Sequence, residues 1–169
     1  MSTHPTMTIS FRLNGRDRDL EIEPRELLID VLRDRLGLTG VKRSCDLQVC
    51  GSCTVLLDGD AVSACTTLAL EMDEREVTSI EGLADGDQLD PVQRAFVDVG
   101  ALQCGFCTPG MILAARELLD HEPEPTRERI REHLEGNLCR CTGYARIVEA
   151  VHRAAVTSTT TASDLDKDQ

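Results

Sequence analysis

All eight cysteines of this chain fall into two groups of four whose spacing suits metal ligation. The first group has the pattern C-x4-C-x2-C, followed by a fourth cysteine after eleven intervening residues. Thiolates at this spacing are the ligands of plant-type 2Fe–2S clusters, which carry one electron at a time. The second group pairs C-x2-C with a distant C-x-C. The groups are Cys45, Cys50, Cys53 and Cys65, and Cys104, Cys107, Cys139 and Cys141.

The elements that must position the first group are mostly strands. Alternating apolar residues predict strands, and the pairs Asn14-Gly15 and Asp58-Gly59 are typical hairpin turns. A helical repeat of apolar residues predicts one helix over 27–36, which Gly37 ends. Three of the cysteines then fall in an expected loop, 39–53. The expected strands are 8–13, 20–22, 54–57, 61–64 and 76–80.

The second half of the chain changes to a helical period from Pro91 onward, so the fold class is predicted to be α+β. Both cysteine pairs of the second group directly precede a predicted helix, where the helix dipole favours negative charge. The expected helices are 91–99, 111–119, 126–134 and 144–156. The predicted domains are 1–82 and 91–156, with a linker at 83–90 and a disordered tail at 157–169.

Composition excludes several classes of function. The net charge of -12 argues against nucleic-acid binding, which needs clustered Lys and Arg. No stretch approaches the roughly 20 apolar residues of a membrane helix, and the N-terminus lacks a secretion-signal pattern. A cytoplasmic location is therefore expected. Because disulfides are rare in reducing compartments, eight cysteines there indicate metal or redox chemistry.

Alternative readings of the cysteines remain open. A disulfide framework lacks a supporting secretion signal, and the first group lacks the paired C-x2-C knuckles that zinc prefers. The second group taken alone could hold zinc. Its C-x-x-C could also be a redox dithiol, although that chemistry needs a βαβ setting. The histidines show no C-x-H arrangement of a Rieske site and are expected to be ordinary surface residues: His4, His121, His133 and His152.

The motifs around the cysteines resemble those of one family closely. They are CDLQVCGSCTV at 45–55, QCGFCTPG at 103–110 and NLCRCTGY at 137–144. Over roughly 8–156 the chain resembles the small iron–sulfur subunit of the molybdenum hydroxylases, which include xanthine dehydrogenases, aldehyde oxidoreductases and aerobic carbon monoxide dehydrogenases. The resemblance implies an N-terminal β-grasp, plant-type ferredoxin-like domain and a C-terminal all-α four-helix 2Fe–2S domain. Ser44 and Gln48 stand where the family often has glycine, and Ser52 replaces a common alanine, which bears on the potential of the N-terminal cluster and not on its existence.

This resemblance implies an electron-transfer subunit without catalytic residues of its own. Electrons would pass from a molybdopterin, expected in its cytosine dinucleotide form, on a large subunit, to FAD on a medium subunit. The cluster of Cys104, Cys107, Cys139 and Cys141 would lie on the molybdenum side, with Gln103 and Cys141 facing the pterin. The cluster of Cys45, Cys50, Cys53 and Cys65 would lie on the FAD side. A dimer of heterotrimers is expected.

Two other functions are considered beside it. A free-standing two-cluster ferredoxin would shuttle electrons by diffusion and would purify as an isolated monomer. A zinc-stabilised interaction module would have no redox role. The substrate of the complex would be oxidised on another chain, so this sequence does not identify it.

Overall fold

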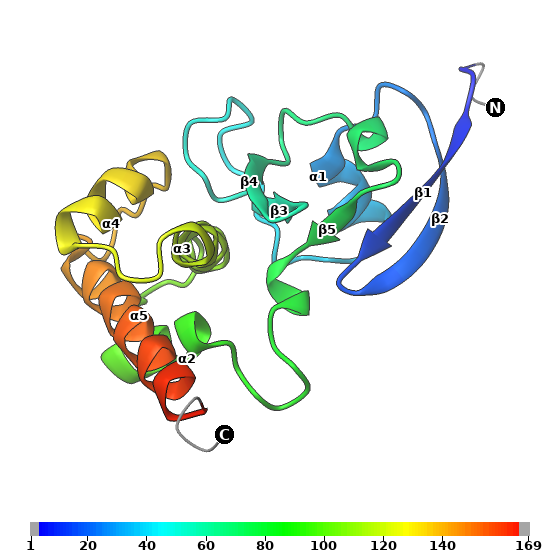
Figure 1. Ribbon diagram of the computed structural model, residues 1–169. Coiled ribbons are helices and arrows are strands. Elements are labelled where there is room, and N and C mark those ends of the chain that lie inside the picture. Colours follow the sequence, from blue (N-terminus) through cyan, green and yellow to red (C-terminus); the bar gives the residue numbers. More distant parts are fainter. Residues whose placement is uncertain (1–3, 166–169) are drawn as a thin grey trace.

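The computed structural model describes residues 4–165, which form a sheet-containing half and a helical half (Figure 1). Strands β1 (Met7–Leu13) and β2 (Arg16–Ile22) form the predicted hairpin through Asn14 and Gly15, both at positive φ. The remaining strands are β3 (Thr54–Leu57), β4 (Asp60–Ser63) and β5 (Glu76–Thr78). The mixed sheet has the order β2-β1-β5-β3-β4, in which β1 and β5 are parallel and the other pairs are antiparallel.

The predicted first helix is present, but its second part is wider than an α-helix. It consists of α1 (Leu28–Asp30) and a π-helical turn, η1 (Val31–Arg35), which closes with a bond from the N–H of Leu36 to the carbonyl of Val31. Gly37 ends it at φ 72°. The helix and the inward residues of the sheet share one hydrophobic core, which includes Ile9, Phe11, Ile22, Leu28, Leu32, Val55 and Val77.

Four helices build the second half, as the periodicity predicts. They are α2 (Pro91–Val99), α3 (Thr108–His121), α4 (Arg127–His133) and α5 (Ala145–Leu165). Asp90 caps α2 by accepting a bond from the N–H of Val92, and Thr126 caps α4 through the N–H of Arg129. Helix α3 lies between the sheet and the other helices (Figure 1), so it contacts both halves.

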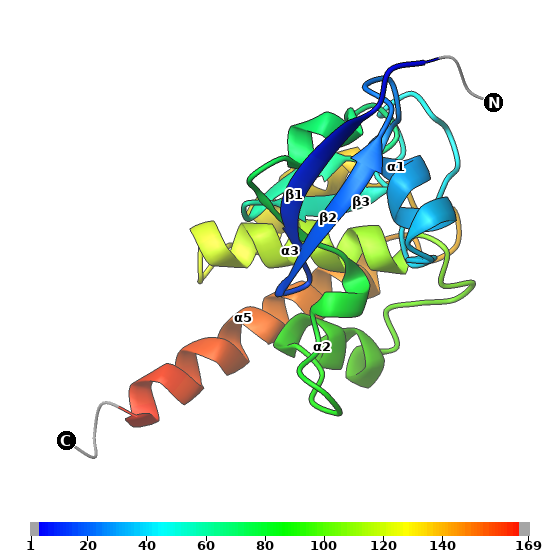
Figure 2. The same cartoon turned by 90° about the vertical axis from the view of Figure 1, so that its right-hand side faces the viewer.

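The C-terminal boundary of the last helix differs from the expectation. A disordered tail was predicted from Thr157, but α5 continues to Leu165 and extends away from the other helices (Figure 2). Once a helix is nucleated, each further residue adds one hydrogen bond at little cost, and this segment contains neither Gly nor Pro. Residues 166–169 of the predicted tail lie outside the described residues.

The fifth expected strand is also shorter than predicted. It ends at Thr78 and is followed by a 3-10 turn, η3 (Ile80–Gly82). A second hydrophobic core, separate from the first, fills the helical half around Phe96, Met111 and Ile147. The boundary placed at 83–90 stays a prediction. Within the described part of the chain, no helix is long and apolar enough to cross a membrane.

Candidate metal centres

The structure brings the four N-terminal cysteines together through one loop and one hairpin. Cys45 and Cys50 are half-buried and lie in the loop before β3, and Cys53 directly precedes that strand. In the β3–β4 register Thr54 pairs with Ser63, and the N–H of Ala64 donates to the carbonyl of Cys53 at 3.3 Å. This pairing carries Cys65 back to Cys53, and both are buried.

Backbone donors make this loop suitable for thiolates. The N–H groups of Leu47, Val49 and Cys50 point at the sulfur of Cys45 and lower its pKa to about 6; the nitrogen of Leu47 lies 3.5 Å from it. Positive φ angles at Asp46 and Gln48 curl the loop around the sulfur. By contrast, burial raises the pKa of Cys53 to about 12. The outer part of the group therefore favours negative charge, whereas its inner part is desolvated.

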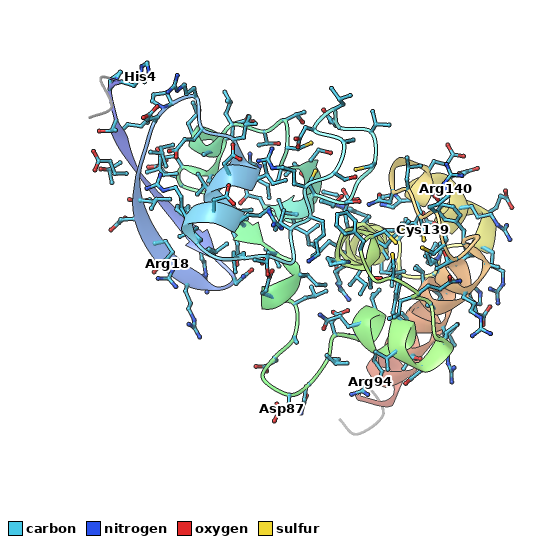
Figure 3. The ribbon with its side chains drawn as sticks, turned by 180° about the vertical axis from the view of Figure 1, so that it is seen from behind. His4, Arg18, Asp87, Arg94, Cys139 and Arg140 are labelled. Atoms are coloured by element: carbon cyan, nitrogen blue, oxygen red, sulfur yellow. The ribbon has the colours of Figure 1, made fainter. Side chains whose placement is uncertain are left out.

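The second group is assembled at the beginnings of α3 and α5. Cys107 is the N-cap residue of α3, and Cys104 lies three residues before it. Cys139 and Cys141 lie on the segment between α4 and α5, where Figure 3 labels Cys139. The sulfurs of Cys104 and Cys141 are 3.5 Å apart. Tetrahedral metal–sulfur bonds of about 2.3 Å place two thiolates on one metal roughly 3.8 Å apart, so this pair suits a shared metal atom.

The cysteines of this second group differ in pKa because they differ in burial and in local hydrogen bonds. Burial works against ionisation of Cys139, but the hydroxyl of Thr142 at 3.2 Å and nearby N–H groups outweigh it and lower the pKa of Cys139 to about 7. Burial raises the pKa of Cys107 to about 12. Cys104 and Cys141 are exposed, which leaves this side of the group open to a partner.

A cavity of 560 Å³ at the second group has the donor set that an iron–sulfur cluster requires. All four of these cysteines line it, and Ser44, Cys50 and Ser52 from the first domain also line it. All eight cysteines lie within the described residues and are free thiols, so the disulfide alternative does not hold in this structure. The residues present fit 2Fe–2S clusters, because soft thiolates and inward-facing N–H groups are the features that such clusters use. The individual ligand assignments stay predictions.

Gln103, which is predicted to face the pterin, is exposed and directly precedes Cys104 in the chain; its contact with a pterin stays a prediction. A further residue near this group was not recognised from the sequence. The hydroxyl of Tyr144 accepts a bond from the N–H of Cys139 at 2.8 Å and donates to the carbonyl of Asn137 at 3.3 Å. Tyr144 is the only tyrosine of the chain and directly follows the C-x-C-T-G motif, a signal that could have identified it.

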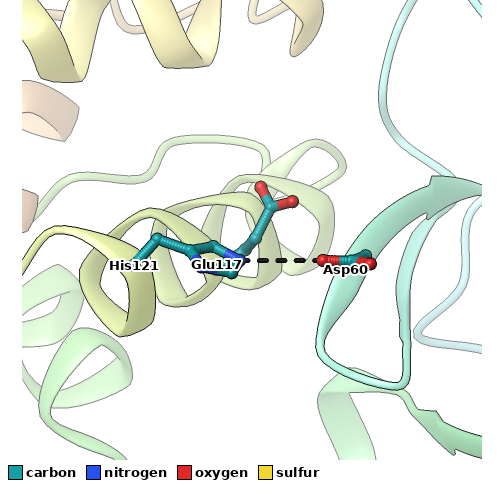
Figure 4. A group of neighbouring side chains, drawn as sticks. All are labelled: Asp60, Glu117 and His121. Carbon is teal, nitrogen blue, oxygen red and sulfur yellow. Dashed lines mark ion pairs between the residues drawn. The ribbon is translucent and has the colours of Figure 1, made fainter.

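Away from the cysteines, a small group of ionisable side chains lies where the two halves meet. His121 on α3 faces Asp60 at the start of β4, with 3.6 Å between the imidazole nitrogen and the carboxylate (Figure 4). Glu117 beside them accepts a bond from the N–H of Ala61 at 3.0 Å and lies 2.9 Å from His133. Although such residue types can bind metal, the carboxylate of Glu117 is already used as a contact between the two halves.

The expectation that His133 is an ordinary surface residue is wrong. Its side chain is only 20% exposed, because α4 packs against α3 and brings the ring nitrogen Nε2 to 3.0 Å from the carbonyl oxygen of Ala114 and 2.9 Å from the carboxylate of Glu117. The sequence offers no local signal for this contact, since the partners belong to a different helix.

In a comparison with known proteins, each half of the chain matches a protein family. Residues 11–84 match the family described as 2Fe-2S iron-sulfur cluster binding domain, and residues 79–152 match the family described as 2Fe-2S binding domain. The N-terminal and helical domains thus each correspond to a known 2Fe–2S domain type, which is the α+β arrangement predicted from the sequence.

Individual relatives match most of this chain over most of their own length. The chain is 47% identical to the nicotinate dehydrogenase small FeS subunit of Eubacterium barkeri, covering 88% of this chain and 94% of that one. It is 52% identical to the nicotine 6-hydroxylase small subunit of Paenarthrobacter nicotinovorans, covering 85% and 86%. A crystal structure of quinoline 2-oxidoreductase from Pseudomonas putida 86 superposes with a TM-score of 0.87 at 44% identity, covering 92% of this chain and 97% of that chain. The chain therefore belongs to the small 2Fe–2S subunits of the molybdenum hydroxylase family.

Proposed function

We propose that this chain relays single electrons from a molybdopterin centre on a large partner subunit to FAD on a medium partner subunit. When bound, the two 2Fe–2S clusters would supply one-electron redox chemistry. The observation that carries the proposal is the direct contact between the two cysteine groups. The N–H of Leu138, the residue before Cys139, donates to the carbonyl of Cys50 at 2.9 Å. This backbone hydrogen bond joins the polypeptide segments that hold the two groups.

The orientation of the relay is the one that the family resemblance implies, and the exposure of the second group supports it. We place the group at Cys104 and Cys141 on the molybdenum side, because these two cysteines and Gln103 are exposed and could approach a pterin, expected as the cytosine dinucleotide. The group that includes Cys45 and Cys50 would then face FAD. Its outer loop carries backbone donors toward sulfur, which would stabilise a reduced, more negative cluster.

Exposed apolar side chains support docking of both partners. Leu47 and Val49 project from the N-terminal cysteine loop, with exposures of 73% and 58%. Phe106 and Leu138 are exposed beside the second group. Apolar side chains of this size gather at protein–protein interfaces. We propose a dimer of heterotrimers in the cytoplasm, in which substrate is oxidised on the large subunit.

Metal and sulfide analysis with low-temperature EPR of the reduced protein tests the proposal first. Two irons and two sulfides for each group of four cysteines, with two distinct EPR signals, are expected. Zinc without a reduced signal would contradict the proposal. Purification as an isolated monomer, without large and medium partners, would instead favour a diffusing ferredoxin.

Replacement of one ligand tests the order of the relay in the complex. Cys107→Ser should remove or perturb the cluster of the helical domain and leave the N-terminal cluster intact. Reduction of molybdenum by substrate should survive, whereas reduction of the flavin should become slow; stopped-flow absorbance follows both steps. Unchanged flavin reduction would take the helical-domain cluster out of the path.

A further inference from the structure

A buried asparagine lies at the junction between the two cysteine groups. Asn137 is 7% exposed and directly follows the 3-10 turn Leu134–Gly136. Its side-chain amide donates to the carbonyl of Gly51 at 3.0 Å and contacts the hydroxyl of Thr54 at 3.3 Å. Both partners belong to the other domain and flank Cys53. The amide therefore bonds the first cysteine loop from a position two residues before Cys139.

The backbones at this junction are too close to admit side chains. A Cβ atom on Gly51 would lie 2.5 Å from the amide nitrogen of Asn137, and one on Gly110 of α3 would lie 2.2 Å from the carbonyl oxygen of Gly51. Gly51 also has φ 64°, a conformation that favours glycine. The segments that contain Gly51, Gly110 and Asn137 are thus packed backbone to backbone. No flexible side chain lies between them that could move to compensate for a small displacement at Asn137.

The hydrogen bonds at the junction form one connected set. The hydroxyl of Thr54 donates to the carbonyl of Gly51 at 2.8 Å, so that carbonyl accepts bonds from both the hydroxyl and the amide of Asn137. The bond from Leu138 to Cys50 lies on the adjoining backbone. Among these groups the amide of Asn137 is the only side chain contributed by the helical domain. If the amide of Asn137 were removed, the bond from the N–H of Leu138 to the carbonyl of Cys50 would be the remaining hydrogen bond of this set that joins the two domains.

We propose that Asn137 is a positioning residue that sets the separation and orientation of the two cysteine groups, and through them the speed of electron exchange between the clusters. This inference rests on the proposed function. Electron tunnelling weakens steeply with distance, so a small displacement of the first loop against the Asn137–Cys139 segment slows exchange. Alanine at this position cannot bond Gly51, and aspartate would set a carboxylate against its carbonyl oxygen.

The test compares variants of the full-length chain carrying its clusters. Asn137→Ala removes the amide, Thr54→Val removes its hydroxyl partner, and Thr54→Ser retains that hydroxyl. Ser79→Ala is the matched control, because Ser79 is a buried hydroxyl that bonds Asn14 and Glu81 rather than either cysteine loop. The readouts are iron content, the two EPR signals of the reduced protein, and the spin–spin interaction between them.

The expected result is that Asn137→Ala keeps both signals but shows a weaker spin–spin interaction between the clusters. Thr54→Val should shift these readouts in the same direction, whereas Thr54→Ser and Ser79→Ala should match the wild type. Both signals with an unchanged interaction in Asn137→Ala would overturn the proposal. If Asn137→Ala loses a cluster, the spin–spin interaction in Thr54→Val tests the proposal instead. An unchanged interaction in that variant would overturn the proposal. A wild-type protein without two signals would refute the proposed function itself.

Discussion

Tyr144→Phe is the substitution whose effect the structure defines most closely. The ring packs against the helical core and is retained in the variant, so only the hydroxyl is lost. That hydroxyl accepts the N–H of Cys139 at 2.8 Å and donates to the carbonyl of Asn137 at 3.3 Å. The change therefore removes two hydrogen bonds that hold the segment carrying two of the second-group cysteines, without creating a cavity in the core.

The expected magnitude follows from these two bonds. Each contributes about 0.5–1.5 kcal/mol net, so the free energy of unfolding should fall by about 1–3 kcal/mol. With a urea slope of about 1–3 kcal/mol per molar, the midpoint should fall by roughly 1 M. Because the N–H of Cys139 is no longer held, the cluster of the helical domain should also be released faster than the N-terminal cluster.

Urea unfolding followed by far-UV circular dichroism measures the midpoint, and visible absorbance measures cluster release. Ser10→Ala serves as control, because it removes a hydroxyl that bonds Asp19 on the exposed side of the β1–β2 hairpin. Its effect should stay within about 0.5 kcal/mol. If Tyr144→Phe matches the wild type in both midpoint and release rate, the hydroxyl does not hold the segment and the reasoning fails.

Three further predictions can be tested by the same urea assay. Burial raises the pKa of Asp90, so the folded state binds that proton more tightly and stability falls as pH rises from the ordinary Asp pKa of about 3.9 toward the raised value. Asp90→Asn should keep the helix cap and abolish this pH dependence, and an unchanged pH profile would show that another group causes it. Gln48→Gly removes the exposed hydrogen bond that the hydroxyl of Thr66 donates to Gln48 at 3.2 Å. Relief of left-handed strain should exceed this loss and the entropy cost of glycine, so stability should rise by less than about 1 kcal/mol; a loss of stability would contradict this. Glu117→Ala leaves the N–H of Ala61 without its acceptor and should lower the free energy of unfolding by about 1–3 kcal/mol. The control Asp60→Ala changes an exposed residue and should lower it by less than about 0.5 kcal/mol. Equal effects of the two substitutions would exclude the Glu117–Ala61 hydrogen bond as the cause.

Most secondary structure was predictable because its signals are local. Asn14-Gly15 and Asp58-Gly59 form the expected hairpin turns, and Thr126 caps the helix that it was expected to begin. Gly37 ends the first helix in the left-handed conformation that glycine tolerates. The π-helical turn at 31–35 and the continuation of α5 past Thr157 were not predicted. Both concern how far or how tightly a helix is wound, which apolar periodicity constrains weakly.

The spacing of the cysteines was enough to predict the metal chemistry of this chain. The spacing of the cysteines defined two groups of four, and the motifs around them indicated the family that the comparisons show. Short spacings carry this information because a few residues of loop can place neighbouring thiolates around only a small number of metal arrangements.

The contact between the two cysteine groups is visible only in the folded chain. Asn137 and Gly51 are separated by 86 positions, and Glu117 and Ala61 by 56, so no local pattern indicates either contact. Each contact depends on the packing of α3 between the sheet and the helices, which sets one domain against the other. Residue types and spacing indicate which atoms can hold metal. The distance between the two cysteine groups depends instead on how the backbones of the two halves pack, so it is fixed only when the whole chain is folded.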